Sequence, residues 1–229
     1  MKNLHIVVDG VSYIREPVKT HFITQGESYI DIIKKYVLNE GVDSVTKIGY
    51  DDFISISEKI IALCQNRVIR RDELEVGFWA RFLSRFASHP STGVGVGEAI
   101  KMQYAIHKVG LVKVLFASVA SAFTKLIGKK GVFYEIVGQE VAGLDGFYDH
   151  IWEEYRDIGI ELPLDPEGVC REIKEKTGVS CMIVDANDLG QEVLGCSDDI
   201  RHLNLLAFIK DNPAGQGREQ TPIIIMHKV

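Results

Sequence analysis

The clearest candidate for chemistry in this sequence is a group of polar residues that directly follows a predicted strand. Asp185, Asn187 and Asp188 come after the apolar run of residues 180–184. An aspartate at the end of a buried strand holds a hard oxygen ligand on rigid backbone. Mg²⁺ or Mn²⁺ is bound by one or two such carboxylates together with phosphate oxygens and water. The alternative is a polar turn in which Asp185 and Asn187 accept hydrogen bonds from nearby N–H groups.

A second candidate ligand, Asp145, lies in the run Ala-Gly-Leu-Asp-Gly at residues 142–146. Glycines on both sides of it would let the backbone approach a ligand closely. An ordinary turn is the alternative. The two aspartates would repel each other across a shared site, but a divalent ion between them would reverse this and bridge to phosphates.

Two glycine-containing loops could bind anions. The first, with Gly93, Gly95 and Gly97, precedes a predicted helix whose free N–H groups would attract phosphate or carboxylate. Its G-x-G-x-G spacing is neither the dinucleotide-binding nor the Walker pattern. A flexible loop is the alternative.

The second loop, residues 212–222, precedes the last predicted strand and contains two glycines, an arginine and an acid. Backbone N–H groups and the guanidinium could hold anionic groups, while Glu219 or Gln216 could contact base or ribose. A solvated connection is the alternative. The residues expected to bind nucleotide here are Gly215, Gln216, Gly217, Arg218 and Glu219.

Composition limits the class of protein. The 229 residues include 26 Lys and Arg against 32 Asp and Glu, a net charge of −6. Because nucleic-acid binders are usually basic, no nucleic-acid partner is expected. The longest apolar run, residues 114–123, is half a membrane span and predicts a buried helix. Without a recognisable signal peptide, we expect a cytoplasmic protein with no membrane partner.

Strands and helices are predicted to alternate irregularly, which favours an α+β (mixed α/β) fold. Strands are expected at residues 4–8, 11–15, 53–57, 132–137, 180–184 and 222–227. Helices are expected at residues 29–39, 72–86, 98–108, 111–127, 166–176 and 200–210, and residues 60–64 form either a short helix or more strand. The strongest local signals are the Asp9-Gly10 turn, the Ser28 cap, and Pro166 and Gly178 around one helix.

An aromatic stripe at helical spacing stands out in the 72–86 segment. It is predicted to pack in the core or at a subunit interface. Together with the apolar run 114–123 it predicts a homodimer, because one cleft does not require so much apolar surface. The stripe consists of Phe78, Trp79, Phe82 and Phe86.

Four motifs together resemble the coenzyme F-420-0:L-glutamate ligase (F-420-0 γ-glutamyl ligase) family. They are residues 142–145, residues 162–168, the run Ile-Val-Asp-Ala-Asn at 183–187 and the closing glycine loop. Their order and spacing agree over roughly residues 143–229, and residues 16–67 agree more weakly. The chain looks like a divergent subgroup, a single ligase-like unit over 1–229 with an expanded, mostly helical segment at about 75–130.

The resemblance implies a chemistry. These ligases use GTP and a divalent cation to activate a carboxylate of a deazaflavin phosphodiester as an acyl phosphate, which the amine of glutamate then attacks. The family's metal aspartates fall on Asp145 and Asp185, and Asn187 also matches. Its nucleotide loop falls on residues 215–220.

Several family positions differ in this sequence. The hydroxyl residue that the family has between its metal ligands is replaced here by Ala186. A Gly-Leu-Pro-like nucleotide contact near the N-terminus is replaced by residues 19–23. A Ser-Thr pair followed by a lysine is here Glu58-Lys59 followed by Leu63, although Lys59 could reach the same place. Two functions are therefore open: a GTP- and Mg²⁺- or Mn²⁺-dependent amide ligase, and a non-catalytic nucleotide- or metabolite-binding protein.

Overall fold

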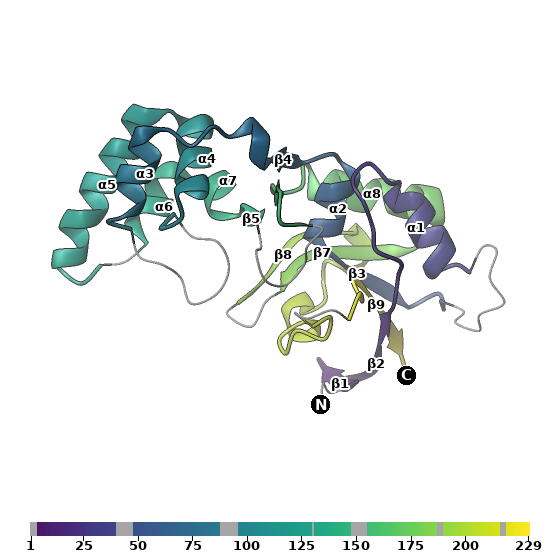
Figure 1. The fold of residues 1–229 in the computed structure, drawn as a ribbon. Coiled ribbons are helices and arrows are strands. Elements are labelled where there is room, and N and C mark those ends of the chain that lie inside the picture. Colours follow the sequence, from purple (N-terminus) through teal and green to yellow (C-terminus); the bar gives the residue numbers. More distant parts are fainter. Residues whose placement is uncertain are drawn as a thin grey trace. The chain divides into compact units, whose positions relative to one another are not determined.

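The computed structural model describes residues 4–39, 48–87, 96–129, 131–147, 155–186, 190–215 and 219–229 (Figure 1). By contacts between Cα atoms the chain divides into two compact units. Unit 1 comprises Met1–Asn66 and Pro163–Val229, and unit 2 comprises Arg67–Leu162. Both contain helices and strands, so the predicted α+β class is confirmed. We expected one ligase-like unit with a helical segment at about residues 75–130, and that segment lies within unit 2.

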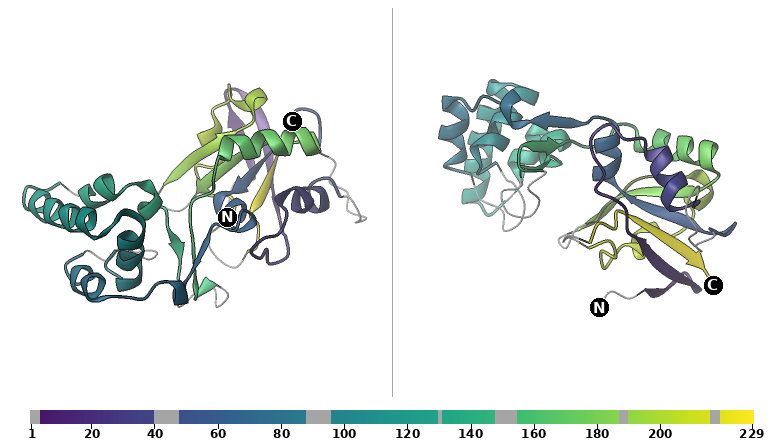
Figure 2. Two further views of the ribbon diagram at one scale, coloured as in Figure 1. Left: turned by 90° about the horizontal axis from the view of Figure 1, so that it is seen from above. Right: turned by 45° about the vertical axis from the view of Figure 1, so that its right-hand side comes forward.

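Unit 1 contains, within its described residues, a six-stranded sheet in the order β1-β2-β9-β3-β7-β8. Only β3 and β7 are parallel neighbours, and the other pairs are antiparallel. Figure 2 shows the N-terminal strands beside the last strand. The strands are β1 His5–Val8, β2 Val11–Val18, β3 Phe53–Ser57, β7 Ser180–Ala186, β8 Gln191–Cys196 and β9 Ile223–Lys228.

Helices cover one face of this sheet: α1 Tyr29–Tyr36, α2 Glu58–Cys64 and α8 Pro166–Thr177 (Figure 1). The opposite face packs on two short 3₁₀ helices, η3 Asp198–Ile200 and η4 Leu205–Phe208. Because both faces are covered, the central strands are apolar on both sides; four of the five β3 residues are buried.

Local chemistry explains the elements that the sequence predicted well. Asp9 and Gly10 both have positive φ, as a tight two-residue hairpin turn requires. The Ser28 side chain accepts a hydrogen bond from the Asp31 N–H at the start of α1. Pro166 opens α8, and Gly178 ends it with a φ of 74°. These signals act within four residues, so they need no tertiary partner.

Unit 2 is mainly helical. Its core contains Met102, Tyr104 and Val141, with three short strands in the order β4-β6-β5 beside it. The strands are β4 Val68–Arg70, β5 Asp145–Gly146 and β6 Ile158–Ile160. The helices are η1 Arg71–Glu73, α3 Phe78–Ser84, α4 Ala99–Val109, α5 Leu111–Leu126, α6 Val132–Val137 and α7 Gln139–Ala142. Among the described residues, none of the helices combines the length and apolar character that a membrane crossing requires.

Three predictions of secondary structure were wrong. Residues 132–137 form helix α6 rather than a strand, because a six-residue apolar run suits either state and packing against α5 decides. The helix expected at residues 72–86 is broken, and α3 starts only after Gly77. The helix expected at residues 200–210 is replaced by 3₁₀ turns, which bring Ile200, Leu205 and Phe208 into the core under the sheet.

The aromatic stripe of α3 does not lie in the core of unit 2. Its four side chains are 40–73% exposed. They contact one another instead, with Phe78 and Phe82 stacked at 5.9 Å between ring centroids. The core interpretation is therefore wrong for this stripe, and the interface interpretation stays a prediction.

Asp52 connects β3 to the end of β9. Its carboxylate accepts hydrogen bonds from the Gly49 and Lys228 N–H groups at 2.7 and 3.0 Å, and it lies 2.9 Å from the His227 ring. Burial alone would raise the pKa of Asp52, but these hydrogen bonds outweigh it and hold the pKa below its usual value. The ionised form therefore stabilises the native state.

We expect Asp52→Asn to lower the free energy of unfolding at pH 7 by about 1–3 kcal/mol. Because the folded pKa is below the unfolded one, this stabilisation is present above pH ~4 and is lost as pH falls through the folded pKa. Urea unfolding of both proteins from pH 7 to 2.5 would test this. The neighbouring exposed Asp51→Asn variant is the control and should change little. A pH-independent difference for Asp52→Asn would contradict the prediction.

Candidate functional site

One edge of the unit 1 sheet collects Lys59, Asp185 and the two described ends of the predicted nucleotide loop. Strands β2, β3 and β7 run in the same direction, so their carboxyl ends lie at this edge, where β8 and β9 begin. In this register Val18 pairs with Ile223, and Ser57 pairs with Val184. Lys59, Asp185 and the loop before β9 are therefore brought together by topology, although they are far apart in the sequence.

The predicted nucleotide loop is closed at its base. The Thr221 hydroxyl donates to the Ala214 carbonyl at 2.7 Å, and the Thr20 and Ser57 N–H groups donate to the carbonyls of Gln220 and Pro222, both at 2.9 Å. The returning strand of the loop is thus tied to the ends of β2 and β3.

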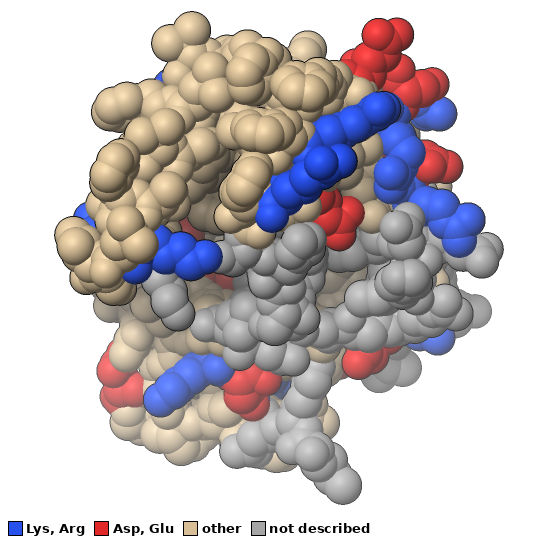
Figure 3. Space-filling view, turned by 60° about the vertical axis from the view of Figure 1, so that its left-hand side comes forward, with Lys and Arg blue, Asp and Glu red and all other residues tan. Residues whose placement is uncertain are grey.

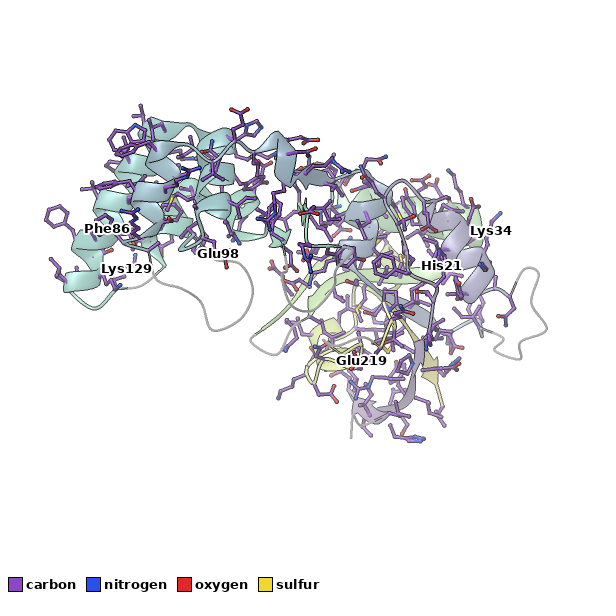
Figure 4. All side chains as sticks on the ribbon, viewed as in Figure 1. His21, Lys34, Phe86, Glu98, Lys129 and Glu219 are labelled. Carbon is purple, nitrogen blue, oxygen red and sulfur yellow. The ribbon has the colours of Figure 1, made fainter. Side chains whose placement is uncertain are left out.

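Within that loop Gly215 has a φ of 88°, which favours glycine, and Glu219 is exposed (Figure 4). Gln216, Gly217 and Arg218 lie outside the described residues. Their role stays a prediction.

Arg15 holds the segment that leads into the loop. Its side chain is 1% exposed and lies on β2. It donates hydrogen bonds to the Phe208 carbonyl at 3.0 Å and to both carboxylate oxygens of Asp211, one at 2.8 Å. A buried guanidinium in this bidentate geometry fixes the start of the loop against the sheet.

The leucine that replaces the family's lysine on α2 has a structural role. Leu63, where a lysine is expected, is 1% exposed and belongs to the core. Lys59 is half-buried in the first turn of α2, directly after β3. Of these two positions, only Lys59 can present a cation at this sheet edge.

Residues 19–23, which stand where the ligase family has a nucleotide contact near the N-terminus, pack against α1. His21 Nδ1 lies 2.7 Å from the Tyr36 hydroxyl, and Nε2 lies 2.6 Å from Glu27 Oε2 (Figure 4). The histidine ring also stacks on Tyr36. The His21 ring is therefore held by Tyr36 on α1 and by Glu27 just before that helix.

Asp185 lies near the end of β7, half-buried, and Asn187 lies outside the described residues. Across the sheet Asp185 pairs with Glu192 on β8. Directly opposed residues have Cβ atoms about 5 Å apart, so the two acidic side chains lie on the same face of the sheet, and Glu192 is exposed. Metal binding by this pair stays a prediction. Sequence analysis missed Glu192, because β8 carries a bulge that disturbs its alternation.

No group of three or more His, Cys, Asp or Glu side chains arranged to hold a metal occurs among the described residues. Any ion at the end of β7 would therefore need further ligands from phosphate and water. This is the usual situation for Mg²⁺ bound with a nucleotide.

Asp145 is on β5 of unit 2. Its carboxylate accepts a hydrogen bond from the Gly146 N–H at 2.9 Å. The flanking glycines are required by packing within the protein. A Cβ at Gly143 would lie 2.6 Å from Leu162, and one at Gly146 would lie 2.4 Å from the Ile158 carbonyl. Asp145 belongs to unit 2 and Asp185 to unit 1, so the shared ion stays a prediction.

Lys101 supports the turn that carries Asp145, and sequence analysis missed it. Its side chain is 4% exposed, and its ammonium donates to the carbonyls of Leu144 at 2.8 Å and Ala142 at 3.3 Å. Burial lowers the pKa of Lys101 to about 8, although the Asp145 carboxylate opposes the shift. The sequence signal that could have revealed it is a lysine at a position on the apolar face of the predicted helix α4.

The first glycine loop lies mostly outside the described residues, which include Gly97 but not Gly93 or Gly95. Helix α4 begins two residues after Gly97. Glu98 is its N-cap residue and makes no side-chain capping hydrogen bond. Anion binding at this loop stays a prediction.

Comparison with known proteins identifies no family. No protein-family model matches this chain. The chain is similar to an uncharacterized protein, MJ1361, of Methanocaldococcus jannaschii, with 28% identity over 87 residues. This match covers 38% of this chain and 28% of the length of that protein. The resemblance to F-420-0 ligases therefore stays a prediction.

The buried ammonium of Lys101 predicts a pH dependence. Its pKa is lower in the folded than in the unfolded chain, so the unfolded chain binds more protons between pH 8 and 10.5. The stability of the wild type should therefore rise relative to that of Lys101→Met as pH increases through this window, by up to about 3 kcal/mol. Urea unfolding at pH 7.5, 9 and 10.5 measures this.

The exposed Lys113→Met variant, on α5 of the same unit, is the matched control. It should show no such change relative to the wild type. Parallel stability curves for the wild type and Lys101→Met would refute the assigned protonation change.

Proposed function

We propose that this protein is a nucleotide-dependent amide ligase. It activates a carboxylate as an acyl phosphate and joins it to the amine of an amino acid such as L-glutamate. GTP is the proposed co-substrate, and the carboxylate is that of a small molecule such as a deazaflavin phosphodiester. The observation that carries the proposal is the convergence of Lys59, Asp185 and the hydrogen-bonded base of the loop before β9 on one sheet edge.

The proposed reaction has two steps. In the first, a carboxylate oxygen attacks the γ-phosphorus of GTP, which forms the acyl phosphate and releases GDP. In the second, the amine nitrogen attacks the acyl carbon and loses a proton to solvent, the amide bond forms, and inorganic phosphate leaves with the electron pair of the broken C–O bond. No covalent bond to the protein is needed, so the protein contributes positioning and charge neutralisation.

Each residue has a defined task in this proposal. The backbone N–H groups of the loop and the Arg218 guanidinium bind phosphate oxygens, and Glu219 or Gln216 contacts the nucleoside. Lys59 supplies a second cation from the first turn of α2. Asp185, with Glu192 opposite and Asn187 two residues on, would hold Mg²⁺ or Mn²⁺, as would Asp145 from unit 2. When bound, that ion neutralises the negative charge that builds up on the phosphates.

A second candidate function is a non-catalytic nucleotide- or metabolite-binding protein. Two observations favour it: Leu63 is a core residue where the resemblance expects a lysine, and Ala186 offers no hydroxyl ligand. The two functions differ in turnover. Release of GDP and phosphate that requires both a carboxylate and an amine substrate would support the ligase, and stoichiometric binding without release would support the binding protein.

We expect Asp185→Asn to weaken Mn²⁺-dependent GTP binding by more than tenfold, or about 1.4 kcal/mol, because it removes one negative charge and keeps the side-chain shape. Calorimetric titration of GTP with and without Mn²⁺ measures this. The control Asp9→Asn changes an aspartate in the hairpin turn at the opposite edge of the sheet and should leave affinity unchanged.

Equal metal-dependent affinity in wild type and Asp185→Asn would exclude Asp185 as a ligand and make the binding protein the better candidate. The Asp145→Asn and double variants then test the shared ion. If both aspartates hold one ion, the loss in the double variant should be smaller than the sum of the single losses.

The loop is tested separately through Arg218. Charge-assisted hydrogen bonds to phosphate contribute about 1.5–3 kcal/mol, so Arg218→Ala should weaken GTP binding about tenfold or more. Arg171→Ala, an exposed arginine on α8, is the control. Unchanged affinity in Arg218→Ala would make the loop a solvated connection.

A further inference from the structure

Helix α5 is apolar on both of its faces, and unit 2 covers only one of them. Val114 and Ala117 are fully buried, and this side packs against α4 and α6. These two are the only buried residues of the helix. A helix that is hydrophobic all round is normally buried all round. The second apolar face of α5 is therefore not covered by the described residues of the single chain.

The exposed face has a regular pattern. Its five large side chains follow one another at spacings of four, three, four and three residues, which is the a/d repeat of a coiled-coil seam. Ile127 extends the stripe at its C-terminal end and is 80% exposed. The five side chains and their exposures are Val112 83%, Phe116 65%, Val119 55%, Phe123 68% and Leu126 84%.

The size of this stripe fits a stable protein interface. Taking about 150–200 Å² for each large apolar side chain, and exposures of 55–84%, the two phenylalanines and four aliphatic side chains together present on the order of 700 Å² of apolar surface. That is above the largest apolar patch of a typical monomer, about 300–600 Å². It matches the roughly 800 Å² that each partner buries in a standard protein complex.

The charged residues around the stripe give no pattern that would recognise a charged partner. Residues 99–134 contain no Asp or Glu. On α5 itself the charged residues are Lys113 and Lys125, both exposed. In Figure 3 the upper left of the surface is mostly tan, with Lys and Arg along its border and Asp and Glu beyond them. The stripe carries no charges that would select an opposite pattern, so apolar packing has to supply the affinity.

We propose that this face of α5 is the docking surface for α5 of a second copy of the chain, in an antiparallel pair about a two-fold axis. In an antiparallel coiled coil an a residue packs against a d residue of the partner. Each of Phe116 and Phe123 then meets an aliphatic side chain, Leu126 or Val119. A parallel pair in register would instead place phenylalanine on phenylalanine in the same layer. The stripe is thus complementary to itself, as a two-fold interface requires.

The pattern also separates this proposal from binding to a lipid surface. A helix that lies in a membrane interface buries a broad apolar face, whereas a strict a/d stripe is the narrower seam of a helix pair. The proposal is independent of the proposed ligase activity, because the dimer can be measured without nucleotide.

Light scattering with gel filtration over a concentration series tests the pairing. The wild type should be a dimer, and Phe116→Glu and Phe123→Glu should each weaken the dimer at least a hundredfold, because a carboxylate would be buried in the seam. Both side chains are largely exposed in the single chain, so circular dichroism should show an unchanged fold. Phe86→Glu, at 73% exposure two residues beyond the end of α3, is the matched control and should stay dimeric.

Any other pattern among these variants overturns the assignment to α5, as does a monomeric wild type at high concentration. Sedimentation with vesicles of anionic lipid adds a further arm: binding of a monomeric wild type that Phe123→Glu abolishes would replace the second copy with a membrane surface.

The orientation of the pair is tested by a new thiol. Ala122 is exposed beside the stripe, and in the antiparallel pair its position lies close to that of its symmetry mate. Ala122→Cys should form a disulfide between copies under mild oxidation. The wild type, with three buried cysteines and the half-buried Cys64, is the control and should not form this cross-link. A dimer without this cross-link would overturn the antiparallel arrangement.

Discussion

The buried guanidinium of Arg15 is the constraint on which the arrangement of unit 1 depends. A cation that is 1% exposed needs hydrogen-bond acceptors around it, and here they are the Phe208 carbonyl and the Asp211 carboxylate. Both acceptors lie at or just after η4, so Arg15 ties this segment to β2. A single buried charge on β2 therefore fixes the start of the segment that leads into the loop before β9.

Unit 2 depends on buried charges in a similar way. The Glu161 carboxylate, which is 9% exposed, forms ion pairs with Arg67 at 3.0 Å and Lys108 at 2.6 Å. It also accepts a hydrogen bond from the Tyr104 hydroxyl at 2.8 Å. Burial alone would raise the pKa of Glu161, but the hydrogen bonds from Lys108 and Tyr104 and the charge of Arg67 lower it. This network and the buried ammonium of Lys101 hold the short strands of unit 2 against its helices. The expanded helical segment thus supplies cations for the turn that carries Asp145, as well as apolar packing.

The candidate site follows from sheet topology. Three strands that run in the same direction deliver their carboxyl ends to one edge, and two returning strands begin there. Ligands in open sheets bind outside such carboxyl ends, because the side chains that follow them are free of the ladder and converge. The positions that differ from the ligase pattern also have structural roles in this chain. Leu63 fills the core, and the segment after β2 packs on α1 through His21 and Tyr36.

The sequence by itself determined the elements whose signals are local. The Asp9-Gly10 hairpin, the Ser28 cap and the Pro166–Gly178 boundaries of α8 depend on backbone preferences and hydrogen bonds within four residues. The local sequence alone therefore reveals them. It also placed the β7 strand and the Asp185 that it delivers. Tertiary structure decided the rest. The contact of Arg15 with Phe208 spans 193 residues, and the pairing of Asp185 with Glu192 requires a bulged strand that has no clean alternation. Residues 132–137 became a helix, and α5 kept an apolar face exposed, because packing partners outside these segments choose between states that their own residues leave equally favourable.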